Sequence, residues 1–142
     1  ALHEWRSWLS CFDVVQMNKD EYGLLTETPD GPRGFKDLLA AGPRVASVTF
    51  GSGGVIVAYR VNGRTFVEEV TVKRKLGDPT GCGDVWGAVM CGRLLAGMTP
   101  VASAHVANRV AAESVDHKGI EGLTNRLADA SRDILGDSFI NL

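Results

Sequence analysis

The sequence predicts an α/β protein with a mostly parallel β-sheet, helices on its faces and a hairpin at one sheet edge. Short apolar runs rich in β-branched residues alternate with segments of helical periodicity, which is typical of parallel strands joined by helices. Asn62-Gly63 lies between two alternating runs and is a strong signal for a hairpin turn. The chain has 142 residues, which suits one domain with a substantial core, so we expect residues 1–142 to form a single domain.

The individual elements follow from hydrophobic periodicity and from turn residues. Apolar residues recur at helical spacing near the start, and two β-branched apolar runs are typical of buried strands. Gly42-Pro43 ends a short helix before the second run. In chain order, the sequence predicts a helix end at 2–9, a strand at 12–17, a helical turn at 19–25, a helix at 35–41, a strand at 44–50, hairpin strands at 55–59 and 64–70, and helices at 85–96, 100–115 and 125–135.

The helix at 85–96 is expected to be buried on most of its sides, because its residues are almost all apolar or small. Gly97 ends this helix, and Pro100 suits the first position of the next one. Tryptophans at helical positions are expected in the core rather than on a stacking platform. They are Trp5, Trp8 and Trp86.

Composition argues against several classes of partner. The net charge is −2, and no cluster of Lys and Arg with interleaved aromatic residues indicates nucleic-acid binding. The one basic run, residues 73–75, is expected to be a solvated loop or strand end. No apolar run approaches the roughly 20 residues that span a bilayer, and the first ten residues do not form a signal peptide. We therefore expect neither nucleic acid nor a membrane as a partner.

The cysteine usage indicates a reducing compartment. Cys11, Cys82 and Cys91 are an odd number without a C-x-x-C pair, which fits neither a disulfide framework nor a zinc site. A cytoplasmic location is therefore expected. Cys91 lies in the apolar helix and is expected to be buried and inert. His105 and His117 are expected at the surface or as satisfied core residues rather than as metal ligands.

Three loops lie where ligands bind in sheets of this kind, beyond the carboxyl ends of strands. They are residues 18–21, 49–54 and 78–84. Their convergence on one edge of the predicted sheet indicates a ligand site. A dinucleotide-binding module is disfavoured, because no G-x-G-x-x-G follows the first strand.

The loop Gly81-Cys82-Gly83-Asp84 carries the clearest chemical signal, because it falls where a loop becomes a helix. The first turn of a helix has about four backbone N–H groups without intrahelical partners, and its dipole favours negative charge. Small residues let a phosphate approach these groups. A carboxylate here would repel phosphate, and proton abstraction from an attacking hydroxyl explains Asp84. The alternative is that Asp84 only caps the helix and the glycines only turn the chain.

Residues 78–84 (DPTGCGD) resemble the D-T-x-G-A-G-D signature of the ribokinase-like (PfkB) family of sugar and nucleoside kinases. Residues 18–21 (NKDE) look like the family's N-x-x-E motif, and residues 48–54 (VTFGSGG) look like its V-T-x-G-x-x-G segment. The helix at 100–115 is similar to the family's helix beside the adenine pocket. The resemblance runs from about Leu2 to about Asn125, most of the chain.

The resemblance implies a ribokinase-like three-layer sandwich, truncated at its N-terminal side, and a phosphoryl-transfer site. Asp84 would take the proton from the substrate hydroxyl that attacks the γ-phosphate of ATP. Backbone N–H groups of Gly81, Cys82 and Gly83 would stabilise charge on the transferring group. Mg²⁺ would be organised through water by Asn18 and Glu21. The nucleotide would lie along Thr49, Gly51 and Gly54, with Asn108 near the adenine.

The sequence departs from the family pattern in the signature loop and in extent. Pro79 replaces the usual Thr and removes one N–H donor, and Cys82 replaces the usual Ala, adding bulk and an oxidisable thiol. Residues 116–119 (DHKG) resemble the loop that lines the adenine or a monovalent-cation site, with an ordinary solvated loop as the alternative. The family's first strands, Gly-Gly motif and small β lid are missing, and the chain begins without Met in a helix, which predicts a fragment.

The sequence therefore predicts ATP- and Mg²⁺-dependent phosphorylation of a hydroxyl on a sugar or sugar-like molecule, with a monovalent cation as a further candidate cofactor. A sugar or nucleoside is the expected small-molecule partner, and a homo-oligomer is allowed. The fragment by itself is expected to be inactive. The alternative function is a non-catalytic nucleotide-binding or partner-binding remnant of the family.

Overall fold

The computed structural model describes residues 4–26, 32–72, 77–115, 122–125 and 127–129. The chain divides into two compact units, Ala1–Thr71 and Val72–Leu142. The single domain expected from the length stays a prediction. Within the described residues, no helix is long and apolar enough to cross a membrane.

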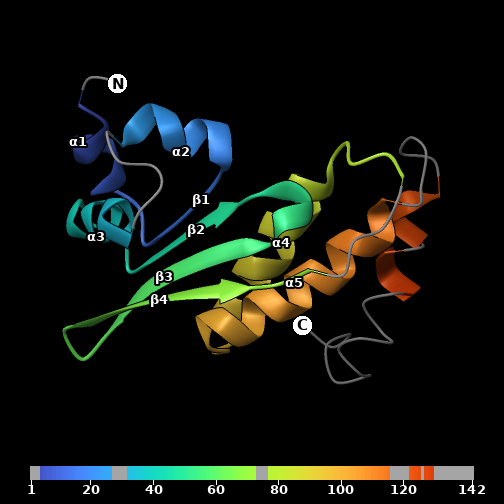
Figure 1. Ribbon diagram of the computed structural model, residues 1–142. Coiled ribbons are helices and arrows are strands. Elements are labelled where there is room, and N and C mark those ends of the chain that lie inside the picture. Colours follow the sequence, from blue (N-terminus) through green and yellow to red (C-terminus); the bar gives the residue numbers. More distant parts are fainter. Residues whose placement is uncertain (1–3, 27–31, 73–76, 116–121, 126, 130–142) are drawn as a thin grey trace. The chain divides into compact units, whose positions relative to one another are not determined.

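The first unit is built on a four-stranded sheet with the order β1-β2-β3-β4 (Figure 1). Strands β1 (Val14–Asn18) and β2 (Val45–Thr49) pair in parallel, with Val14 opposite Val45 and Asn18 opposite Thr49. β2, β3 (Val55–Val61) and β4 (Arg64–Val70) pair in antiparallel fashion. The sheet is therefore mixed, with its antiparallel hairpin at one edge, and the fold class is α/β as predicted.

The predicted hairpin is confirmed in its turn and in both strands. Asn62 and Gly63 have φ values of 49° and 75°, and two consecutive positive values are what a type I′ turn requires. On the strands, the rings of Tyr59 and Phe66 stack with centroids 5.3 Å apart. The Tyr59 hydroxyl hydrogen-bonds Glu68, and this bond raises the pKa of Tyr59.

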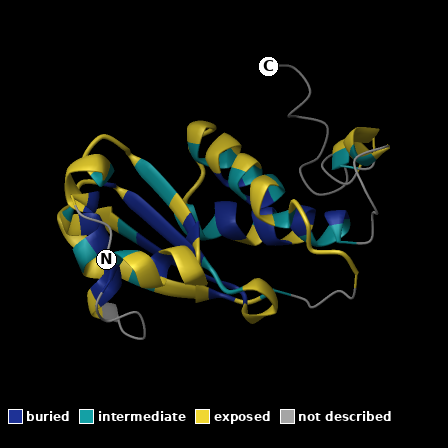
Figure 2. Ribbon diagram, turned by 90° about the horizontal axis from the view of Figure 1, so that it is seen from above, coloured by how far each residue is buried: buried dark blue, intermediate teal, exposed yellow. Residues whose placement is uncertain are grey.

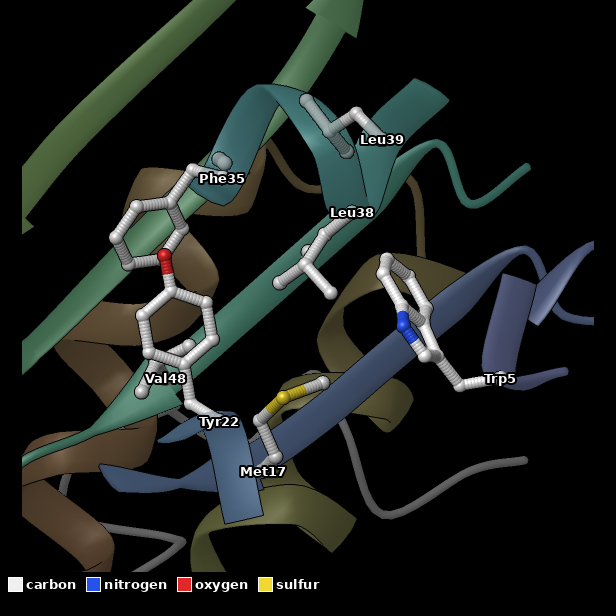
Figure 3. Close-up of a cluster of buried hydrophobic side chains, with 9 residues drawn as sticks. Trp5, Met17, Tyr22, Phe35, Leu38, Leu39 and Val48 are labelled. Atoms are coloured by element: carbon white, nitrogen blue, oxygen red, sulfur yellow. The ribbon is translucent and has the colours of Figure 1, made fainter. Parts of the chain in front are cut away.

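Three helices cover one face of this sheet: α1 (Trp5–Leu9), α2 (Lys19–Leu25) and α3 (Pro32–Ala40). Their apolar side chains and alternate strand residues form the core (Figure 3). Tyr22 of α2 stacks on Phe35 of α3 at 4.9 Å. Burying a large apolar side chain contributes about 1.5–3 kcal/mol, so this cluster accounts for much of the unit's stability. Its members are Trp5, Met17, Tyr22, Phe35, Leu38, Leu39, Ala46, Val48 and Ala58.

The first helix meets this core through one of its two tryptophans. Trp5 is buried, and the Arg6 guanidinium carbon lies over its ring, 4.3 Å from the ring centroid. Trp8 is 57% exposed, so the prediction that it belongs to the core is wrong. The reason is length: α1 has five residues, and so short a helix presents little more than one large side chain to its neighbours.

The second unit contains α4 (Cys82–Leu95) and α5 (Pro100–Ser114), which pack against each other. The Thr99 hydroxyl caps α5 by accepting the Ala102 N–H at 3.4 Å, and Pro100 occupies the first turn as predicted. Residues 123–125 and 127–129 are also helical. The rest of the helix predicted at 125–135 lies outside the described residues, as does the basic run at 73–75.

The expectation that the apolar helix is buried on most sides is wrong. Within α4, Trp86 and Met90 are buried, whereas Leu95 is 89% exposed. Figure 2 shows that exposed residues recur along the helices of the chain. Cys91 is exposed as well, so its predicted burial is also wrong. When two helices pack together, each buries only the face that contacts the other. An apolar composition does not show whether another element covers the remaining apolar surface. His105 lies exposed on α5, as expected for a surface histidine.

The end of α3 is closed by an arginine from β3. The last carbonyls of a helix have no intrahelical donor, and the helix dipole there favours a positive charge. The Arg60 Nη2 donates to the carbonyl of Leu39, to that of Pro43 at 3.2 Å and to that of Gly42 at 3.4 Å. This side chain therefore joins the edge hairpin to the helical layer of the first unit.

We predict that Arg60→Ala lowers the free energy of unfolding by about 1–2 kcal/mol, because hydrogen bonds from a charged donor to three carbonyls are lost. Arg64→Ala removes the same side chain from the exposed start of β4 and should change stability by less than about 0.5 kcal/mol. Urea denaturation of both variants measures the difference, and equal midpoints would contradict the capping role of Arg60.

Candidate phosphate-binding site

The loop before α4 is shaped by a tight turn that requires glycine. The Cys82 N–H donates to the Pro79 carbonyl at 3.1 Å, which closes a four-residue turn. Gly81 has φ 80° and ψ −7°, the values of the third residue of a type II turn, where glycine is favoured because φ is positive. The Asp78 carboxylate accepts the Thr80 N–H at 3.0 Å and supports the turn from its start.

The first turn of α4 has N–H donors without an acceptor among the residues that the structure describes. Gly81 is the N-cap residue and supplies no side-chain cap, while Asn18 caps α2 and Thr99 caps α5. The Cys82 N–H, one of the three donors that the sequence assigned to the phosphate, is bonded to the Pro79 carbonyl. No described residue accepts a hydrogen bond from the N–H of Gly83 or Asp84. The positive end of a 14-residue helix dipole therefore lies beside two donors and the exposed Asp84 carboxylate.

The chain itself does not require glycine at position 83. Its φ is not positive, and a Cβ built there would meet no atom of the described residues within 4 Å apart from its chain neighbours and the backbone of its own helix. Glycine in the middle of a helix is less stable than alanine by roughly 0.5–1 kcal/mol. At the second residue of α4 the cost has this upper bound, and the fold does not explain it. The open space beside Gly83 fits the close approach of an anion to the helix N–H groups.

Two side-chain contacts join α4 to α5 just behind this turn. The Trp86 Nε1 donates to the Asn108 Oδ1 at 2.8 Å, and both side chains are buried. The Cys82 Sγ lies 3.2 Å from the Ser114 Oγ. The side-chain amide oxygen of Asn108 therefore points toward Trp86, a partner that the sequence did not indicate.

In the first unit, Asn18 and Glu21 form a capping box at the start of α2. The Glu21 N–H donates to the Asn18 Oδ1 at 2.9 Å, and the Asn18 N–H donates to the Glu21 Oε2 at 2.7 Å. Asn-x-x-Glu at the start of a helix is a sequence pattern typical of a capping box. The sequence therefore already contained a signal for this structural role. The second carboxylate oxygen of Glu21 still offers acceptor sites for magnesium-bound water. Among described residues, no three His, Cys, Asp or Glu side chains cluster as a metal site.

The loop after β2 has structural reasons for two of its glycines. Gly51 has a φ of 58° and opens the 3₁₀ turn Gly51–Gly53. Gly54 has a φ of 94°, and a Cβ there would lie 2.7 Å from the Val70 carbonyl oxygen. The Thr49 hydroxyl lies 3.5 Å from the Met17 carbonyl oxygen. These residues do not need a ligand to explain them.

The structure brings the predicted residues together in two groups. In the first unit, Asn18 and Thr49 are opposite each other at the carboxyl ends of two parallel strands. In the second unit, the loop from Gly81 to Asp84 is joined through α4 to Asn108. That the two groups share one nucleotide stays a prediction. Residues 116–119, proposed for the adenine or cation loop, lie outside the described residues.

The model of the pfkB family carbohydrate kinases matches residues 1–125. The chain belongs to the pfkB family. This match includes all the residues that form the loop, the capping box and the turn after β2. The comparison with curated proteins finds no match.

Solved structures of pfkB-like kinases share the fold. Ribokinase from Thermotoga maritima aligns over 89% of this chain and 44% of its own, with 20% identity and a TM-score of 0.71. A Burkholderia thailandensis nucleoside kinase in complex with inosine aligns over 91% and 42%, with 18% identity and a TM-score of 0.71. Arabidopsis thaliana ribokinase with ribose and ATP aligns over 86% and 43%, with 18% identity and a TM-score of 0.67.

These alignments establish a ribokinase-like fold, as the sequence predicted. The chain spans less than half the length of each of these three proteins. The chain therefore belongs to a family of carbohydrate kinases and has part of their fold.

The capping box generates a stability prediction that is independent of any ligand. Asn18→Ala should lower the free energy of unfolding by about 1 kcal/mol, because the first turn of α2 loses its acceptor. Glu21→Gln should leave stability nearly unchanged, since glutamine completes the same box. Urea denaturation compares the two variants, and an equal loss in both would mean that charge rather than capping holds this turn.

Proposed function

We propose that the chain carries the phosphate-donor half of an ATP- and Mg²⁺-dependent kinase that phosphorylates a hydroxyl of a sugar or nucleoside. The observation that carries this proposal is the open position at Gly83, next to Asp84 and beside two N–H donors that have no acceptor among the described residues. Family membership supports the same chemistry. Both ribose and inosine, bound by the structural neighbours, present hydroxyl groups as acceptors.

The loop contributes charge stabilisation. During phosphoryl transfer, negative charge is spread over the oxygens of the transferring group. The N–H groups of Gly83 and Asp84 are fixed by α4 before the ligand arrives, so they need no reorganisation to stabilise that charge. Gly81 holds the turn that presents them, and the Cys82 N–H maintains this turn through Pro79.

Asp84 is the proposed general base. Its carboxylate is exposed in the first turn of α4, where an incoming hydroxyl can reach it. Accepting the hydroxyl proton makes the oxygen a better nucleophile as its bond to phosphorus forms and the bond to the leaving ADP breaks. A carboxylate beside a phosphate site is otherwise unfavourable, and this role accounts for its position.

The first unit would supply the metal and nucleotide contacts. Carboxylate and water oxygens suit Mg²⁺, and Glu21 retains one carboxylate oxygen outside its capping bond. When bound, Mg²⁺ neutralises charge on the phosphates of the donor. Asn18 and Thr49 lie together at the strand ends, with Gly51 and Gly54 forming the loop along which we place the nucleotide. We assign Asn108 to the neighbourhood of the adenine.

A non-catalytic nucleotide-binding remnant is the second candidate. The observation in its favour is the departure of the signature loop from the family pattern, where Pro79 lacks an N–H donor and Cys82 replaces the usual alanine. Both candidates keep the phosphate site and differ in whether a substrate hydroxyl is brought to Asp84.

The three cysteines are free thiols, so we also propose a cytoplasmic setting.

Gly83→Ala separates ligand binding from stability. We predict that it raises the free energy of unfolding by about 0.5–1 kcal/mol, because alanine is the better helix former. It should weaken Mg·ATP binding by about tenfold or more, since a Cβ blocks approach to a charge-assisted hydrogen bond. Gly92→Ala is the matched control in α4, where a Cβ also meets open space, and should raise stability without changing affinity. Calorimetric titration and urea denaturation measure both quantities, and unchanged affinity in Gly83→Ala would contradict the site.

Asp84→Asn separates the two candidate functions in the protein that contains this chain. We predict a fall of about a hundred- to ten-thousandfold in sugar-dependent ADP release, because the general base is lost, with Mg·ATP affinity largely kept. Asp37→Asn on α3 removes a carboxylate elsewhere and should leave turnover unchanged. Equal turnover in Asp84→Asn and the unsubstituted protein would exclude Asp84 as the base.

A further inference from the structure

The loop that leads into α4, residues 77–81, is here called the phosphate loop, and little of it is buried. Each residue from Gly77 to Gly81 is exposed, so hydrophobic packing does not fix its position. The loop nevertheless needs a defined position, because it determines where the first turn of α4 presents its N–H groups. Contacts with the end of α5, at Ser114 and Val115, meet this need.

A backbone hydrogen bond and a close backbone approach join the start of the loop to α5. The Asp78 N–H donates to the Val115 carbonyl at 3.0 Å. At Gly77, a Cβ would lie 2.2 Å from the same carbonyl oxygen and 2.8 Å from the Val115 Cγ1. Its φ is not positive, so glycine is needed here for space rather than for backbone conformation. Because the opposing atom belongs to the backbone, a side chain at position 77 would force the loop away from α5.

A side-chain hydrogen bond joins the other end of the loop to the same place. Ser114 is buried, and its hydroxyl donates to the Ala111 carbonyl at 2.7 Å. A hydroxyl has one proton, so in the 3.2 Å contact the Cys82 thiol is the donor and the Ser114 Oγ is the acceptor. The family's usual alanine could not make this bond. Cys82 therefore provides a link to α5 at the residue that precedes Gly83.

We infer that the end of α5 positions the phosphate loop, with Gly77 and Ser114 as its positioning residues. The inference rests on the proposed function, because it assigns these contacts to the site that binds phosphate. Gly77 allows the loop to lie against the backbone of Val115, and the Asp78 N–H orients the loop by its hydrogen bond to the Val115 carbonyl. Ser114 holds Cys82, the first residue of α4, by accepting a hydrogen bond from its thiol. Neither positioning residue touches the reacting atoms.

The test follows the Cys82 thiol, which reports the loop position without any ligand. In a Cys11→Ser, Cys91→Ser background, Cys82 is the only thiol of the chain. Ser114→Ala removes its acceptor and Gly77→Ala displaces the loop, so both should accelerate alkylation by iodoacetamide. For Ser114→Ala we expect about two- to fivefold, because a thiol is a weak hydrogen-bond donor. Gly92→Ala, the same substitution as Gly77→Ala in open space, should leave the rate unchanged. Rates for both variants that equal that of Gly92→Ala would overturn the inference.

A second measurement connects this position with binding. Calorimetric titration with Mg·ATP should give a weaker affinity for Gly77→Ala and Ser114→Ala than for Gly92→Ala, while circular dichroism reports whether each variant keeps its helices. Should Gly77→Ala fail to fold, Ser114→Ala still decides the question, because it deletes a single oxygen atom. Absence of Mg·ATP binding in the unsubstituted chain would contradict the proposed function, and the alkylation rates would still decide whether α5 holds the loop.

Discussion

The beginning of α4 has backbone N–H groups that the described protein does not use, and the proposed chemistry depends on them. A helix start normally receives a side-chain cap, as α2 does from Asn18 and α5 does from Thr99. The N-cap of α4 is Gly81, which has no side chain to offer. The uncapped donors therefore remain available to an anion, and the helix dipole adds a favourable potential at the same point.

Glycine serves three different physical needs in this chain, and they carry different information about function. Gly81 and Gly51 have positive φ values, and Gly77 and Gly54 make room for a carbonyl oxygen of the chain itself. Gly83 has neither reason, because its φ is ordinary and its surroundings are open. Gly23 and Gly92 are also helical glycines beside open space, so this property alone does not indicate a ligand. Gly83 differs from them because it lies at the start of α4, beside N–H groups without an acceptor among the described residues.

Features that depend on adjacent residues could be predicted from the sequence. Features that depend on which elements pack against each other could not. Asn62-Gly63 specified its hairpin because the turn depends on two adjacent φ angles. The burial of α4 was mispredicted because an apolar composition does not say which surfaces have a partner, and Leu95 remains exposed. The contact between Cys82 and Ser114 spans 32 positions and leaves no periodic pattern. The capping role of Asn18 and Glu21 was readable from spacing, so their assignment to magnesium now competes with a structural explanation.

The most direct test of the phosphate site is the response of individual amide resonances to a phosphate-bearing probe. In ¹H–¹⁵N spectra titrated with Mg·ATP, we expect the largest shifts at the Gly83 and Asp84 N–H groups, which have no described acceptor. The Cys82 N–H should shift less, because it stays bonded to Pro79. A titration in which Gly83 and Asp84 do not move at concentrations that saturate the chain would contradict the account.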